Sequence, residues 1–161
     1  MVKHLNIIFL VAALMLMSSC MSNAHRAHMA SQSVDPAMRT SVLTMKLRQQ
    51  GVQVIRVGEI ITIVMPSDPL FKGNSANLDH GAFHRLNLVA DFLRSYSKVF
   101  VEVAGYTDYL ENPYLASRQA ASVAKYLWSK GIDSRMLYAV GYDSGVSGSA
   151  ENRRIEIHFQ Y

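Results

Sequence analysis

Asp108 is the residue that the sequence best places for chemistry, because it directly follows a strand-like run and precedes a helix-like run. In α/β proteins, ligands bind beyond the carboxyl ends of strands, so a carboxylate at this point is a candidate for ligand contact. The simpler interpretation is that Asp108 caps a turn through its own side chain. Arg118 lies within the helix-like run that follows. It has two interpretations: its guanidinium binds a ligand, or it is an ordinary solvated helix residue.

Other residue patterns argue against catalysis and against metal binding. His80 and His84 have a helical spacing that can hold zinc, but no third ligand has an evident position. The serine-rich stretch 144–149 lacks a nucleophile-elbow motif, and no catalytic constellation is visible. We therefore expect a protein that is not an enzyme and needs no cofactor. The net charge of +4 favours anionic surfaces, whereas no run of Lys and Arg is dense enough to predict nucleic-acid binding.

Cys20 is the single cysteine of the 161 residues, and it ends a segment typical of targeting sequences. Lys3 supplies a positive start, and an apolar run up to Met17 is too short to span a bilayer. The residues before Cys20 resemble the lipobox of bacterial lipoproteins. This predicts a signal peptide over 1–19, diacylglycerol and a further acyl chain on Cys20, and a lipidated tether over 20–34. Met21 favours the outer membrane, and the alternative is an ordinary signal with an unmodified cysteine.

The remaining residues, 35–161, are predicted to form one domain. Helical spacing of apolar residues, with caps and terminal glycines, predicts helices over 37–49, 79–93 and 113–130. Alternating or β-branched runs predict strands over 52–57, 60–65, 99–104, 136–141 and 154–159. The near-continuous apolarity of 60–65 predicts a strand buried on both faces. The order predicts an α/β (α+β) two-layer sandwich, with a mixed sheet and both longer helices on one face.

Four motifs in this order resemble the OmpA C-terminal-like domain, over roughly residues 45 to 160. They are the opening Pro66-Ser67-Asp68 with Ser75-Ala76-Asn77-Leu78, then Gly105-Tyr106-Thr107-Asp108, Leu115-Ala116-Ser117-Arg118-Gln119-Ala120, and Asn152-Arg153-Arg154-Ile155-Glu156-Ile157. Any one of these motifs is weak evidence, whereas four on the expected elements are strong evidence. The resemblance implies the βαβαβ fold of that family and a periplasmic location.

The resemblance also implies non-covalent binding of peptidoglycan through the diaminopimelate of its stem peptide. That zwitterion needs a carboxylate for its ammonium and a guanidinium for its carboxylate, through paired N–H bonds that lysine cannot copy. The motifs carry over to a predicted site of Asp108, Arg118, Thr107, Asn112, Gln119 and Arg154. An alignment without gaps places Gln119 at the family's arginine position, with Arg118 about 100° around the helix.

Two functional hypotheses follow. The first is a binding module whose lipid holds the outer membrane while its domain holds peptidoglycan. The second is a scaffold subunit that has lost its ligand. Gln119 favours it, as do the loop 109–111 and the loop before Asn152, which are both shorter than is usual in the family that the motifs resemble. The small size and these departures also resemble the OmpA-like lipoprotein of Dot/Icm type IV secretion systems. That resemblance reconciles both hypotheses, because it implies an accessory outer-membrane component near the cell wall, with other subunits of a secretion-system core complex as partners.

Overall fold

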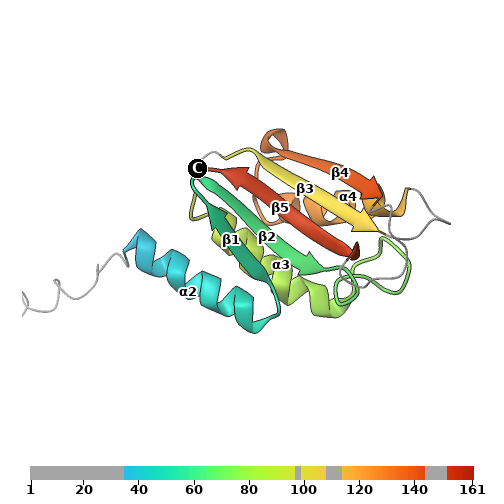
Figure 1. Cartoon of the computed structure of the whole chain (residues 1–161), viewed down its shortest axis with the longest axis horizontal. Helices are drawn as coiled ribbons and strands as arrows, with labels where there is room; N and C mark the ends of the chain where they lie inside the picture. The colour runs from blue at the N-terminus through green and yellow to red at the C-terminus, as the bar shows by residue number, and fades with distance from the viewer. Residues whose placement is uncertain (1–34, 97–98, 108–113, 144–151) are drawn as a thin grey trace, which may run out of the picture. The chain divides into compact units, whose positions relative to one another are not determined.

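A computed structural model describes residues 35–96, 99–107, 114–143 and 152–161 (Figure 1). The predicted signal peptide, Cys20 and the tether lie outside these residues. The elements are α2 (Pro36–Gln49), β1 (Gln53–Val57), β2 (Ile60–Pro66), α3 (His80–Leu93), β3 (Val101–Thr107), α4 (Leu115–Ser129), a 3₁₀ turn (Ser134–Met136), β4 (Leu137–Asp143) and β5 (Arg154–Gln160).

The sheet is mixed, as its sequence order predicts. Its strand order is β1-β2-β5-β3-β4. The β3–β4 pair is parallel, whereas β1–β2, β2–β5 and β5–β3 are antiparallel. Figure 1 shows α3 and α4 on the same side of the sheet. The predicted two-layer α+β sandwich is therefore confirmed, and Asp79 caps α3 as expected, its side chain accepting from the His80 amide.

The expectation that residues 60–65 are buried on both faces is wrong. Ile61, Ile63 and Met65 are completely buried, but Thr62 and Val64 between them are only partly so. Helices cover only the face that carries the first set, because strand side chains alternate between the two faces. The other face of β2 is open. Apolar residues there reflect the β-propensity of branched side chains rather than burial.

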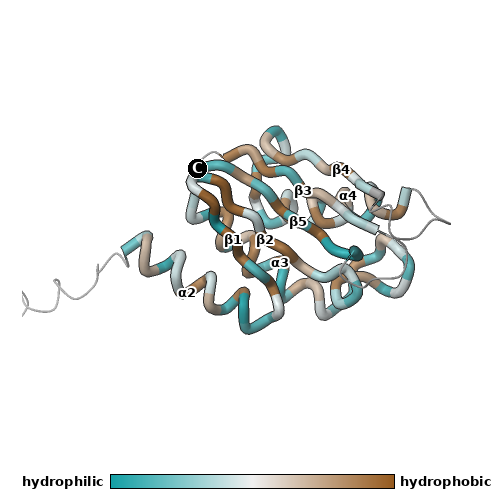
Figure 2. Tube along the Cα trace, viewed as in Figure 1, coloured by the Kyte–Doolittle hydropathy of each residue, from teal (hydrophilic) through white to brown (hydrophobic). Residues whose placement is uncertain are grey.

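The hydrophobic core lies entirely within residues 43–159. Its largest completely buried side chains come from all layers: Phe92, Leu47, Ile61, Ile63, Met65, Leu70, Leu86, Leu115, Leu127, Ile155, Ile157 and Val52. Figure 2 shows hydrophobic segments along β2 and β5, the strands that carry Ile61, Ile63, Met65, Ile155 and Ile157. Residues 36–161 form a compact unit by themselves, so this segment has a complete core of its own and is large enough to fold alone.

Two glycines set the distance between α4 and the sheet. Gly105 of β3 and Gly141 of β4 are partners in the parallel ladder. A Cβ atom on Gly105 would lie 2.3 Å from the carbonyl oxygen of Ala116, and one on Gly141 would lie 2.2 Å from the amide nitrogen of Ser117. The backbone at the start of α4 therefore rests directly on the strands, which only glycine permits. This contact positions the next residues of α4, Arg118 and Gln119.

Candidate functional site

The end of β3 and the first turns of α4 meet at one rim of the domain. Thr107 is the last residue of β3, and its side chain lies on the face covered by helices, where it is buried. Gln119 is also buried and lines the same small cavity as Thr107. The structure thus brings together two residues of the predicted site. Asp108 and Asn112 lie outside the described residues.

Gln119 ties α4 to the loop that follows β2. Its Nε2 atom donates a hydrogen bond of 3.0 Å to the carbonyl oxygen of Ser75. The loop is held by its own bonds as well, since the Lys72 amide donates to Asn77 O at 2.9 Å and Ser75 Oγ donates to Lys72 O at 2.8 Å. Gln119 therefore makes a structural contact in this chain.

We expect Gln119→Met to lower the free energy of unfolding by about 1 kcal/mol, the usual net contribution of one intramolecular hydrogen bond. Methionine keeps the approximate length of the side chain and removes its amide, and with it the donor to Ser75 O. Urea denaturation of the domain measures the change. An unaltered transition midpoint would mean that the bond to Ser75 contributes nothing to stability.

A second charged pair borders this rim. The Arg153 guanidinium donates from Nε to Asp68 Oδ1 at 3.1 Å and from an Nη to Asp68 Oδ2 at 3.0 Å. Such a two-point contact fixes the orientation of both groups. The hydrogen bond from Arg153 lowers the pKa of the Asp68 carboxyl below its ordinary value of 3.8. Sequence reasoning left both residues out of the site, although both stand in motifs shared with the family.

The pKa of Asp68 predicts a pH dependence with a definite sign. Because the folded-state pKa is lowered, the contribution of this pair to stability is complete above pH 3.8 and is lost as pH falls below it. Asp68 is 58% exposed, so the contribution stays below about 1 kcal/mol. An NMR titration of the Asp68 carboxyl carbon should give a low midpoint that Arg153→Gln returns towards 3.8. Equal midpoints in the two proteins would contradict the pairing.

A cavity of about 10 Å³ lies between these groups, lined by Ser67, Asp68, Gly73, Thr107, Gln119 and Arg153. Its size corresponds to roughly one water molecule. Ser67 Oγ is buried there, and no described residue offers it a hydrogen-bond partner. This cavity is therefore too small for a ligand side chain.

Arg154, the remaining arginine of the predicted site, lies on the other face of the sheet. In β5 the buried Ile155 faces the helices, so its neighbours Arg154 and Glu156 face the open side. Arg154 Nε donates to Glu156 Oε1 at 2.6 Å, and its guanidinium stacks 4.0 Å from the centre of the Tyr106 ring. Burial, followed by the charge of Glu156, raises the pKa of Tyr106. The structure does not bring Arg154 together with Thr107 and Gln119.

Arg118 precedes Gln119 on α4 and is exposed, as the helical periodicity requires. Its amide donates to Tyr114 O at 3.0 Å in the first turn of the helix. Arg118 is thus the exposed neighbour of the buried Gln119 on α4. Arg153, whose guanidinium is paired with Asp68, lines the small cavity.

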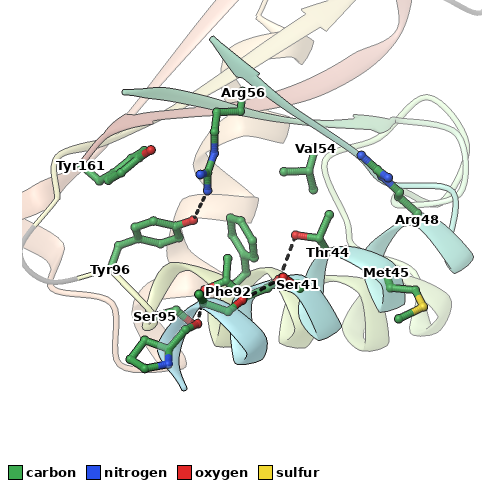
Figure 3. Close-up of a pocket in the computed structure, with 13 residues that line it drawn as sticks. Ser41, Thr44, Met45, Arg48, Val54, Arg56, Phe92, Ser95, Tyr96 and Tyr161 are labelled. Carbon is green, nitrogen blue, oxygen red and sulfur yellow. Dashed lines mark hydrogen bonds between the residues drawn. The ribbon is translucent and has the colours of Figure 1, made fainter. Parts of the chain in front are cut away.

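A larger groove, of about 690 Å³, lies between α2, β1 and α3 (Figure 3). Several of its polar side chains bond within the protein. Arg56 donates to Tyr96 Oη at 3.0 Å, and Ser41 and Thr44 donate to carbonyls of their own helix. Because no opposed charges converge in it, the groove does not match the chemistry of a zwitterion site.

Two further features are absent from the described residues. No group of three or more His, Cys, Asp or Glu side chains there could hold a metal ion. None of the helices in that part of the chain is both long and apolar enough to cross a membrane.

The fold and the site together define the class of protein. It is a two-layer α+β domain with a polar rim between the end of β3 and the start of α4. The chain belongs to the OmpA family, whose model matches residues 70–156. It is 36% identical over 124 residues to the "Probable lipoprotein YiaD" of Escherichia coli, covering 70% of this chain and 57% of that protein. It is 32% identical to outer membrane protein A of Bordetella avium, covering 59% and 55%. The chain thus spans little more than half the length of these relatives.

Solved structures share the fold. The cell wall anchor of the T6SS from Pseudomonas aeruginosa superposes with a TM-score of 0.66 at 25% identity, covering 76% of this chain and 96% of that one. The periplasmic domain of Helicobacter pylori MotB superposes with a TM-score of 0.61 at 23% identity, covering 68% and 79%. The second likeness concerns the fold alone.

Proposed function

We propose that this protein is an outer-membrane lipoprotein whose domain associates non-covalently with peptidoglycan, by binding the diaminopimelate of the stem peptide. The observation that supports the proposal is the close contact of α4 with Gly105 and Gly141, together with the small cavity that Gln119 and Thr107 share. Arg118 precedes Gln119 on α4 and is exposed. Asp108 follows Thr107 directly in the chain. The proposal assigns the Asp108 carboxylate and the Arg118 guanidinium to the same rim.

Each group has a defined part in the proposed binding. Asp108 accepts the ligand ammonium, and Arg118 donates paired N–H bonds to the ligand carboxylate. Asn112 lies between them in the chain and is proposed to contact the ligand through its amide. Thr107 and Gln119 support the rim from inside. Arg154 is proposed to act on binding only through Tyr106, because its side chain lies on the open face of the sheet.

A pull-down with purified sacculi tests the proposal on the domain 36–161. The wild-type domain should sediment with sacculi, and Asp108→Ala should reduce the bound fraction at least tenfold, because the ligand ammonium loses its charge partner. Arg118→Gln should have a similar effect. Lys125→Gln serves as a matched control, since this exposed cation lies further along α4. Undiminished binding of Asp108→Ala would rule out this site.

The lipid anchor belongs to the same proposal. Its support is the lipobox-like segment ending at Cys20 and the kinship with a probable lipoprotein of Escherichia coli. A lipid in the outer membrane and a domain on peptidoglycan would link two layers of the envelope. Neither contact then needs high affinity, because tethering raises the local concentration of the domain at the cell wall.

One observation favours the second candidate, a scaffold subunit without peptidoglycan binding in an envelope-spanning Dot/Icm type IV secretion complex. The side chain at the family's arginine position is buried and bonded to Ser75, and Arg153 is paired with Asp68. Two results together would favour this candidate: the wild-type domain does not bind sacculi, and the protein co-purifies with such a complex from the envelope. Sacculus binding that requires Asp108 would exclude it.

A further inference from the structure

Helix α2 carries two apolar faces instead of one. Leu43 and Leu47 are buried against the rest of the domain. Met38, Val42 and Met45 are 64%, 39% and 56% exposed. At 100° per residue, these three fall within a sector of about 60° on the side opposite the two leucines. A helix that only covers a domain core needs a single apolar stripe, so the exposed stripe is unexplained by the fold.

Cations border the exposed stripe on both sides. Arg39 and Lys46 follow one edge and Arg48 the other, and α2 contains no acidic residue. All three are exposed, and none makes an ion pair or a side-chain hydrogen bond with a described residue. Lys46 and Arg48 lie in the last turn, where they complement the helix dipole. Arg39 lies near the opposite end, where the dipole disfavours a cation, so helix stability does not explain it.

This pattern fits one kind of partner. An apolar stripe flanked by cations is the pattern of a helix that lies in the plane of a membrane interface, with its apolar side chains at the headgroup boundary. Two copies of α2 packed against each other would instead bring like charges together. Met45 and Arg48 also line the groove between α2, β1 and α3, and Figure 3 shows Met45 at the end of that groove away from Tyr161. The exposed stripe therefore adjoins the groove at Met45.

We propose that α2 lies along the surface of a bilayer containing anionic phospholipid, with Met38, Val42 and Met45 inserted at the headgroup boundary. Arg39, Lys46 and Arg48 then contact lipid phosphates. This contact is separate from the peptidoglycan site, because α2 belongs to a different part of the fold. It also does not depend on Cys20, since every residue involved lies in the domain 36–161.

Vesicle sedimentation of the unlipidated domain 36–161 tests the proposal. Vesicles of phosphatidylglycerol with phosphatidylethanolamine should bind it, and purely zwitterionic vesicles should bind it far less. Each cation near an anionic surface contributes about fivefold to binding, so Arg39→Gln with Lys46→Gln should weaken it about 25-fold. The matched control, Lys72→Gln with Lys125→Gln, removes the same charge from exposed positions outside α2 and should bind as the wild type does.

Several outcomes would overturn the proposal. These are equal binding to both vesicle types, equal losses in the two double variants, or no vesicle binding at all. A dimer that Met38→Ser with Met45→Ser abolishes would assign the stripe to a second copy instead. Inorganic phosphate at millimolar concentration should leave vesicle binding intact, and full competition by it would reject the lipid surface. The Arg39 and Lys46 variant should still sediment with sacculi, which separates this proposal from the peptidoglycan site.

Discussion

Replacing Gly141 with alanine is expected to lower the free energy of unfolding by on the order of 3 kcal/mol. The new Cβ would lie 2.2 Å from the Ser117 nitrogen, a backbone atom of α4 that cannot turn aside as a side-chain tip can. The start of the helix must lift from the sheet. Gly105→Ala should act in the same way, because its Cβ would meet the Ala116 carbonyl at 2.3 Å.

Alanine would normally stabilise either position, because glycine in a strand or helix costs roughly 0.5–1 kcal/mol relative to alanine. Gly81 provides the control. It lies in α3, and its added Cβ would find only the flexible tip of Arg85, at 3.7 Å. Gly81→Ala should therefore be neutral or slightly stabilising in the same thermal and urea denaturation experiments. If Gly141→Ala changed the free energy of unfolding no more than Gly81→Ala does, this would contradict the close contact between α4 and β4.

Replacing Cys20 with serine is expected to move nearly all of the protein from the membrane fraction to the soluble fraction. A hydroxyl cannot accept the thioether-linked diacylglycerol, and each buried CH₂ of the lost chains contributes about 0.8 kcal/mol to anchoring. Fractionation with a high-salt wash measures the change, because salt also releases electrostatic contacts such as the one proposed for α2.

Met21→Asp is the companion variant for the anchor. It keeps the lipid-accepting cysteine and should leave the protein membrane-bound while shifting it towards the inner membrane, as the resemblance to lipoproteins implies. A Cys20→Ser protein that stays in the membrane after the salt wash would place the anchor elsewhere in the chain.

Periodicity was sufficient to predict the elements of the fold from the sequence. The α2, α3 and α4 helices begin or end within a few residues of the predicted bounds, because caps and glycines mark those points. The burial of β2 was not predictable in the same way. A run of β-branched residues has the same composition whether one face or both are covered, and only the tertiary arrangement shows that the side of Thr62 and Val64 is open.

The site was less accessible to sequence reasoning, because its members come from separate segments. The motifs identified Thr107 and Gln119, but not that Gln119 bonds to a loop carbonyl more than forty residues away. Arg153 and Arg154 are adjacent in the sequence and identical in type. The alternation of β5 places Arg154 with Glu156 on the open face, and the backbone before the strand directs Arg153 to Asp68. Which arginine borders the rim therefore depends on where the strand begins.

The peptidoglycan site can be tested most directly by NMR titration of the ¹⁵N-labelled domain 36–161 with a soluble stem peptide that contains diaminopimelate. The site predicts that the amide signals of Thr107, Asp108, Arg118 and Gln119 shift together, while those of β1 and α2 stay unchanged. A matched peptide with lysine in place of diaminopimelate lacks the side-chain carboxylate and should cause much smaller shifts. Unperturbed signals at the rim, or equal shifts with both peptides, would contradict the capture of a zwitterion between Asp108 and Arg118.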